Sequence, residues 1–189
     1  MVILFIFISI LLALLISISW TTYKGSPWVP TSLKMTRKML DLAEIQPDEL
    51  LYDLGCGDGR IAIIAARMYQ ARVVGIELNP LLWIWCQLII TILGLRSRVK
   101  IVLGNFYDQD LSDADIVVCY LLPNTNKKLE IKLLRELLPG TRVISNTFLF
   151  YQTRLAKRDG KALLYIFSPE NTQVEFIKRQ LKSSAEETS

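Results

Sequence analysis

Short apolar runs alternate along most of the chain with longer segments whose apolar residues recur at helical spacing. The runs are rich in Val, Ile and Leu and have the length of buried strands, whereas the segments between them are long enough for helices. The predicted strands are residues 50–54, 73–77, 99–103, 116–120 and 142–148, and the predicted helices are residues 32–43, 60–69, 80–93 and 124–138. This alternation is typical of an α/β fold in which right-handed crossovers join parallel strands.

The C-terminal part departs from this alternation. Residues 162–167 and 172–177 are apolar runs separated by a turn-forming sequence at residues 168–171, so we expect an antiparallel hairpin that closes the sheet. Residues 179–189 are polar and are expected to form a frayed tail. A single domain over residues 32–178 suits a chain of 189 residues.

The N-terminal segment has a different character. Val2 to Trp20 contains no charged residue, and a helix of that length spans roughly 28 Å, close to the hydrocarbon thickness of a bilayer. A cleaved signal peptide is the alternative, but no Lys or Arg precedes the apolar run and no small-residue cleavage site follows it. We therefore expect residues 1–20 to form a transmembrane helix that anchors the chain in a membrane.

Charge predicts the orientation of this anchor. Tyr23 and Lys24 follow Trp20 directly, and further basic residues occur at positions 34, 37 and 38, which by the positive-inside rule places the rest of the chain on the cytoplasmic side. Residues 21–31 are punctuated by Gly and Pro and are expected to form a tether between the membrane and the domain. The expected localisation is thus a single-pass membrane protein with a cytoplasmic domain.

Composition excludes several kinds of chemistry. The chain contains no histidine, which rules out a histidine base, a Ser-His-Asp triad and a His-ligated metal site. Its net charge of +4 is mild and its basic residues are spread along the sequence, so no nucleic-acid partner is expected. Cys56, Cys86 and Cys119 have neither zinc-site spacing nor an evident disulfide pattern, which predicts a reducing compartment and no metal.

A glycine-rich turn follows the first predicted strand. The sequence from Asp53 runs Leu54-Gly55-Cys56-Gly57-Asp58-Gly59, and a helix is predicted from Arg60. Glycines allow sharp turns and a close approach of backbone amides to a ligand, and the following helix N-terminus attracts negative groups. Glu77 ends the next strand, where an acid can accept hydrogen bonds from ribose hydroxyls. An ordinary tight turn with Glu77 on a solvated edge is the alternative.

The spacing distinguishes two kinds of nucleoside ligand. A dinucleotide-binding loop needs a third glycine at position 60, where this chain has Arg60. The carboxylates of Asp53 and Asp58 would also repel a pyrophosphate, whereas they suit a ligand that carries an ammonium and a sulfonium. The pattern therefore favours a sulfonium nucleoside over a nicotinamide cofactor.

Other chemistry-bearing residues fall at the ends of the later strands. Asn105 and Phe106 follow the third strand and offer an amide to a base edge and a ring for stacking; a turn Asn beside a core Phe is the alternative. Tyr120 ends the fourth strand, at the sheet edge where open α/β folds bind ligands. A core aromatic is the alternative for Tyr120.

Taken together, these stretches resemble a family of small class I methyltransferases that act on protein lysines. The resemblance covers roughly residues 26–148, and its most particular motif is Trp28-Val29-Pro30-Thr31, ahead of the general glycine loop. The other matching stretches are residues 39–43, 52–61, 74–79, 104–106 and 137–143. The sequence departs from the family after residue 148, so the substrate side is less well predicted than the cofactor side.

The resemblance implies a Rossmann-like class I methyltransferase sheet of seven strands with S-adenosyl-L-methionine as the cofactor and a protein lysine as the acceptor. In this family pattern Asp53, Gly55 and Gly57 line the methionine end, Glu77 the ribose, and Asn105 and Phe106 the adenine. The Val29-Pro30-Thr31 segment would close over the cofactor and help to form the lysine channel. The remaining expected cofactor contacts are Cys56, Asp58, Gly59, Leu78, Asn79 and Tyr120.

Methyl transfer to an amine needs no dedicated base if the site desolvates the amine, which is compatible with a chain lacking histidine. Tyr120 and Asn146 lie at adjacent predicted strand ends and are our candidates for orienting the amine. A methyltransferase acting on a lipid, quinone or small amine, or a protein that binds the cofactor without turnover, would use the same loop. These alternatives remain open.

One predicted helix is unusual because no charged residue occurs between Leu81 and Leu93. A helix that packs on a sheet normally keeps one polar face, and residues 80–94 reach only about 22 Å, which is too short to span a bilayer. We expect the outer face of this helix to rest on the membrane surface, with burial in a homodimer as the alternative. A membrane protein with an accessible lysine would then be a natural substrate.

Overall fold

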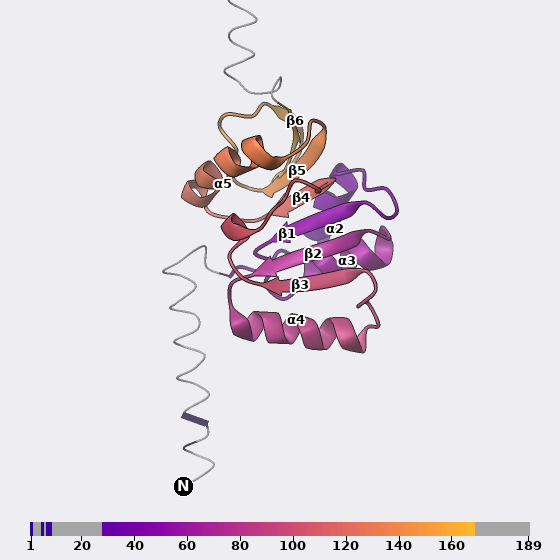
Figure 1. Cartoon of the computed structure of the whole chain (residues 1–189), viewed down its shortest axis with the longest axis vertical. Coiled ribbons are helices and arrows are strands. Elements are labelled where there is room, and N and C mark those ends of the chain that lie inside the picture. The colour runs from indigo at the N-terminus through magenta and orange to yellow at the C-terminus, as the bar shows by residue number, and fades with distance from the viewer. Residues whose placement is uncertain (2–4, 6, 9–27, 169–189) are drawn as a thin grey trace, which may run out of the picture.

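The computed structural model describes residues 1, 5, 7, 8 and 28–168. Within them the strands form one seven-stranded sheet in the order β3-β2-β1-β4-β5-β7-β6 (Figure 1). β1 to β5 are mutually parallel, and β7 runs antiparallel to both β5 and β6. The strands are β1 (Leu50–Leu54), β2 (Arg72–Glu77), β3 (Val99–Leu103), β4 (Ile116–Cys119), β5 (Thr141–Asn146), β6 (Leu155–Asp159) and β7 (Ala162–Phe167). The predicted mostly parallel α/β sheet is confirmed.

Helices cover both faces of the sheet. The helices α2 (Leu33–Leu42), α3 (Arg60–Met68) and α4 (Pro80–Ile92) contribute to one apolar core, and α5 (Pro123–Glu136) contributes to a second core on the other side. A short 3-10 helix, η1 (Phe106–Asp108), follows β3. The N-caps explain where two helices begin: Ser32 accepts from the Met35 amide, and Asn79 accepts from the Leu81 amide.

The C-terminal hairpin is present, but its strands are not those predicted. β7 matches the predicted 162–167, yet its hairpin partner is β6, which precedes it, and its other neighbour is β5. The predicted partner, residues 172–177, lies outside the described residues. β6 escaped prediction because it is an exposed edge strand with charged residues at three of its five positions, and such edges lack the apolar run of a buried strand.

The expected transmembrane anchor at residues 1–20 falls almost entirely on residues that the structure does not describe, and so does the expected tail at 179–189. Among the described residues, no helix has both the length and the apolar character needed to cross a bilayer.

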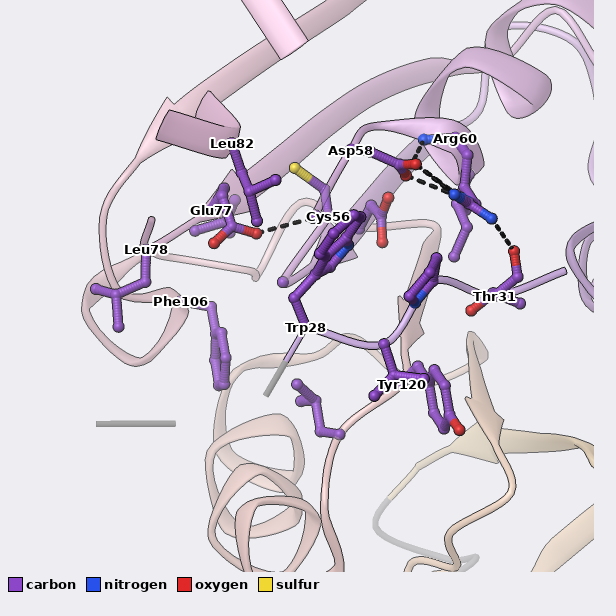
Figure 2. A pocket seen from close by; sticks show the side chains of 18 residues that line it. Trp28, Thr31, Cys56, Asp58, Arg60, Glu77, Leu78, Leu82, Phe106 and Tyr120 are labelled. Carbon is purple, nitrogen blue, oxygen red and sulfur yellow. Dashed lines mark hydrogen bonds and ion pairs between the residues drawn. The ribbon is translucent and has the colours of Figure 1, made fainter. Parts of the chain in front are cut away.

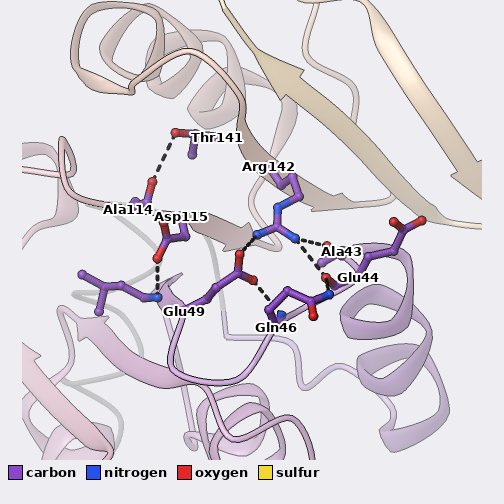
Figure 3. A network of polar contacts seen from close by, with 9 residues as sticks. Ala43, Glu44, Gln46, Glu49, Ala114, Asp115, Thr141 and Arg142 are labelled. Atoms are coloured by element: carbon purple, nitrogen blue, oxygen red, sulfur yellow. Dashed lines mark hydrogen bonds and ion pairs between the residues drawn. The ribbon is translucent and has the colours of Figure 1, made fainter.

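A polar network holds the amino-terminal ends of the central strands together (Figure 3). The Arg142 guanidinium of β5 donates to the carbonyl oxygens of Ala43 and Glu44, at 2.8 and 3.0 Å, and forms an ion pair with Glu49. Asp115 accepts from the Leu50 amide at 2.7 Å. These contacts close one edge of the sheet, so the opposite, carboxyl-terminal edge remains for a ligand.

The strand order reverses between β1 and β4, because the chain runs outward from β1 through β2 to β3 and then returns to the other side of β1. Crossover loops leave the sheet in opposite directions at such a point, and open α/β folds bind ligands in the crevice that results. The loop after β1 and the residues after β4 border this crevice.

Candidate cofactor and acceptor site

The loop after β1 has the left-handed backbone that only glycine adopts freely. Gly55, Gly57 and Gly59 have φ of 75°, 59° and 78°. A Cβ built on Gly57 would lie 2.5 Å from the indole nitrogen of Trp28, so position 57 needs glycine for close approach as well as for its backbone. The amides of Gly55 and Cys56 donate to the Ile76 carbonyl, at 2.9 and 3.1 Å, which ties the loop to β2.

Glu77, at the end of β2, braces this loop. One carboxylate oxygen accepts from the Gly57 amide at 2.8 Å, and the other accepts from the Asn79 amide at 2.8 Å. The side chain is only 7% exposed. Burial raises the pKa of Glu77, and the backbone hydrogen bonds from Asn79, Gly57 and Leu78 oppose that rise. Glu77 is therefore a positioning group for the glycine loop in addition to an acceptor at the pocket wall.

Asp53 places a carboxyl group under the same loop. It is 2% exposed, and its Oδ2 has no hydrogen-bond partner within the described part of the chain. Burial, reinforced by the nearby charges of Glu77 and Asp58, raises the pKa of Asp53 from 3.8 to about 8. An acceptor atom buried without a donor carries an energetic penalty, and a cationic ligand in the pocket would remove it.

Arg60 joins the segment before α2 to the glycine loop (Figure 2). Its guanidinium forms an ion pair with Asp58, with Nε 2.9 Å from Oδ1, and its Nη1 donates to the Thr31 carbonyl at 2.6 Å. The sequence identified Arg60 only as a departure from the dinucleotide motif. In the structure its guanidinium bonds to both Asp58 and Thr31. The Asp58 carboxylate is therefore already paired.

The loop, the segment from Trp28 to Thr31 and the ends of β2 and β4 surround a pocket with an empty volume of about 860 Å³, its open mouth included. The predicted residues that line it are Val29, Pro30, Thr31, Asp53, Gly55, Cys56, Gly57, Asp58, Glu77, Leu78, Phe106 and Tyr120. Figure 2 shows Trp28 lying between Glu77 and the Asp58–Arg60 pair.

Four predicted site residues do not line this pocket. Gly59 is the N-cap of α3, and the side chains of Asn79 and Asn105 accept from backbone amides at the starts of α4 and η1. Asn146 is buried at the end of β5, where its Oδ1 accepts from the Thr147 hydroxyl at 3.0 Å. The two asparagines thus cap helix starts, a role that the sequence analysis did not assign to either of them; its alternative for Asn105 was a turn residue beside a core Phe.

Sequence reasoning did not assign several lining residues to the site. Trp28 and Arg60 line the pocket although no contact was predicted for them, and their places directly beside predicted site residues are the sequence signal that indicates it. The apolar members Ile61, Ile76, Leu82 and Leu121 come from four different elements or loops, and nothing in their local sequence distinguishes them from core residues.

A second aromatic residue lies beside Tyr120. The rings of Tyr120 and Phe148 are 6.4 Å apart between centroids and inclined by 20°. Phe148 follows Thr147, a β-branched residue with φ of 71°, and the Phe148 amide donates to the Asn146 carbonyl at 2.8 Å, as in a γ-turn. Side chains of Asn126 and Ser145 both donate to the Phe148 carbonyl, at 3.0 and 2.5 Å. A strained turn that its surroundings hold so firmly is typical of a functional site.

Comparisons with known proteins agree with this geometry. The family model described as the ANTKMT methyltransferase domain matches residues 53–157. A protein-lysine N-methyltransferase of Saccharolobus islandicus is 45% identical over 123 residues, which cover 65% of this chain and 76% of that protein. The human lysine N-methyltransferase named for the ATP synthase c-subunit is 32% identical over 130 residues, covering 66% of this chain and 52% of the relative. The chain thus spans about half the length of that human protein.

A solved structure adds the ligand. The RNA methyltransferase from Salinibacter ruber, crystallised with S-adenosyl-L-homocysteine, is 38% identical and superposes with a TM-score of 0.66, covering 74% of this chain and 92% of the other. The residues that the family model matches contain the glycine loop and Glu77. The chain therefore belongs to the ANTKMT methyltransferase domain family, an S-adenosylmethionine-dependent methyltransferase family.

Proposed function

We propose that this protein is a membrane-anchored methyltransferase that transfers the methyl group of S-adenosylmethionine to a lysine ε-amine of a protein substrate. The observation that carries the donor half of this proposal is the buried Asp53 carboxyl, whose Oδ2 has no donor among the described residues. The ammonium of the donor's methionine moiety is the cation that suits it. Glu77 and Phe106, which also line the pocket, suit the ribose and the adenine.

The acceptor half rests on the relatives and on the aromatic pair. The Saccharolobus and human relatives are both named for lysine methylation. Tyr120 lines the pocket and faces Phe148, and aromatic rings are suitable walls for the methylene chain and the cationic end of a lysine. We infer that the acceptor lysine approaches the sulfonium along these two rings, and Asn146, at the end of β5, stays a candidate for orienting the amine.

The chemistry is a direct displacement, in which the amine nitrogen bonds to the methyl carbon as the carbon–sulfur bond breaks. Deprotonating a free lysine with a pKa of about 10.4 at pH 7 requires roughly 4–5 kcal/mol. An apolar channel and the neighbouring sulfonium both lower that requirement, because each disfavours the ammonium form. Alignment of nitrogen, carbon and sulfur contributes on the order of 7–11 kcal/mol.

The membrane part of the proposal rests on the uncharged stretch Val2–Trp20 and the basic residues that follow it. An anchor of this kind restricts the enzyme to substrates at the cytoplasmic face of one membrane. Membrane proteins with an exposed lysine are therefore the favoured acceptors.

The test is incubation of the full chain and tritiated S-adenosylmethionine with membranes and cell extract, followed by separation into protein, lipid and RNA fractions. Label in a protein band, recovered as methyl-lysine after hydrolysis, supports the proposal. Label in the lipid fraction, or in RNA as the name of the Salinibacter relative suggests, would overturn the lysine assignment. Glu77→Gln should abolish labelling, whereas Glu44→Gln, at an exposed acid paired with Lys157, is the matched control and should not.

A further inference from the structure

The outward face of α4 is largely apolar. Leu81, Ile84, Trp85, Leu88 and Ile92 recur at helical spacing, and each is between 39% and 68% exposed. Leu93, directly after the helix, and Leu103, at the end of β3, are exposed as well. A surface helix normally turns such residues toward the core. An apolar face that points outward is therefore expected to contact a further apolar surface.

Three side chains of α4 donate hydrogen bonds to neighbouring parts of the chain. Trp83 Nε1 and Gln87 Nε2 both donate to the Ile101 carbonyl of β3, each at 3.1 Å. Cys86 donates to the Gly57 carbonyl at 3.1 Å, whereas Thr91 is exposed and donates to the Gln87 carbonyl of its own helix at 2.6 Å. Trp83, Gln87 and Cys86 thus bond to neighbouring parts of the chain, and the outer face of the helix is left largely apolar.

We propose that this α4 face lies on the surface of a lipid bilayer. Charge favours a membrane: between Leu78 and Tyr107 the chain contains no acidic residue, and of its three cations Arg98 pairs with Asp48 at 2.8 Å, which leaves Arg96 and Lys100 for headgroups. Cations that flank an apolar helix face suit anionic headgroups. The aromatic residue Trp85 on the same face suits the interface between headgroups and acyl chains.

The length of the chain before the described domain leads to the same partner. Seven residues, 21–27, separate Trp20 from Trp28, so at full extension the end of the uncharged stretch lies within about 25–30 Å of Trp28. Trp28 packs on Gly57, and the carbonyl of Gly57 accepts from Cys86 of α4. A bilayer that holds Val2–Trp20 is therefore within reach of α4. The inference rests on the membrane anchor of the proposed function and extends it.

A second copy of the chain suits this face less well. A helix of 13 residues measures about 20 Å by 10 Å, which falls short of the roughly 800 Å² per partner in a typical stable interface. A bilayer needs no complementary shape, and contact with α4 would hold the glycine loop, which α4 touches, beside the membrane. The active site would then face lysines close to the membrane surface.

Depth-dependent quenching in vesicles tests the inference with the full chain. The three native cysteines are buried, so a cysteine introduced as Leu88→Cys can be labelled selectively with an environment-sensitive fluorophore. Ile131→Cys, at an exposed apolar position on α5, is the matched control. Both variants are reconstituted in phosphatidylcholine–phosphatidylglycerol vesicles with and without a lipid that carries a nitroxide on its acyl chain.

The label at position 88 should lose most of its emission in the nitroxide vesicles, and the label at 131 should lose little. Vesicle-bound protein in which neither label is quenched would overturn the α4 inference and leave the anchor intact. Self-quenching of the label at position 88 without nitroxide lipid would show that the α4 face contacts a second copy of the chain, and this result would also overturn the α4 inference. Protein that fails to float with vesicles would refute the anchor and the α4 contact together, whereas methyl transfer, measured separately, tests the proposed chemistry.

Discussion

Replacement of Asp53 by Asn separates folding stability from donor binding. The folded protein keeps the Asp53 carboxyl protonated up to a pKa of about 8, whereas the ordinary value is 3.8. Between these values the unfolded chain is ionised at this group and the folded chain is not. A raised carboxyl pKa thus gives stability that is full below pH 3.8 and is lost progressively as pH rises toward 8.

The magnitude follows from the pKa difference. Each pH unit between 3.8 and 8 lowers the free energy of unfolding by about 1.4 kcal/mol, so at pH 7 the loss reaches about 4 kcal/mol. Asp53→Asn removes this loss but leaves an amide nitrogen where Oδ2 is buried without a partner, which costs about 1–3 kcal/mol. The variant should therefore be more stable than the native protein at pH 7 by about 1–3 kcal/mol.

Urea unfolding of both proteins at pH 5, 6 and 7.5 measures this difference. The advantage of the variant should grow with pH by about 1.4 kcal/mol per unit and shrink to nothing or reverse near pH 4. Calorimetry should show at the same time that the variant binds S-adenosylmethionine much more weakly. A stability difference that stays constant with pH would refute the reasoning, because it would mean that Asp53 is ionised in the folded protein.

Four further outcomes are expected. The affinity for S-adenosylmethionine should increase as pH rises toward 8, and binding should release a proton, because the ligand's ammonium favours ionised Asp53. Calorimetric titrations in buffers of different ionisation heat measure the released proton, and an affinity that does not change with pH would contradict the prediction. Gly57→Ala should weaken donor binding and shift tryptophan emission, because the new Cβ would lie 2.5 Å from the Trp28 indole and the left-handed backbone adds a penalty of about 1 kcal/mol. Gly94→Ala is the control, since a Cβ at position 94 has no neighbouring atom within 4 Å. Glu130→Gln should lower the free energy of unfolding by about 2 kcal/mol, because the buried carboxylate accepts from the amides of Tyr151, Gln152 and Thr153; an unchanged urea midpoint would argue against it. Phe148→Ala should raise KM for a lysine peptide and leave donor affinity unchanged, and equal KM values would remove Phe148 from the acceptor path.

The order of the elements was predictable because it depends on local patterns. Apolar runs of strand length identified β1 to β5 and β7, and apolar residues at helical spacing identified α2 to α5. The glycine loop was predictable for the same reason, since backbone φ values above zero favour glycine at alternate positions of the loop. The strand β6 could not be predicted in this way, because an edge strand need not bury apolar residues.

The site was predictable only in part. Asp53 is the last but one residue of β1 and Glu77 is the last residue of the neighbouring parallel strand β2, so both lie near the carboxyl-terminal edge of the sheet, as the predicted strands implied. The pairing of Asp58 with Arg60, the contact of Trp28 with Gly57 and the stacking of Phe148 beside Tyr120 join segments far apart or depend on side-chain direction. No local pattern specifies such contacts.

The sequence by itself determined the fold class, the glycine loop and the absence of histidine chemistry, because each follows from residue type and short-range spacing. Only the tertiary structure decided that burial raises the pKa of Asp53 and leaves its Oδ2 without a donor among the described residues, that Glu77 braces the loop through the Gly57 amide, and that α4 turns its apolar face outward. Burial, pKa and side-chain direction depend on what the rest of the chain packs against each residue, and that packing exists only once the sheet has formed.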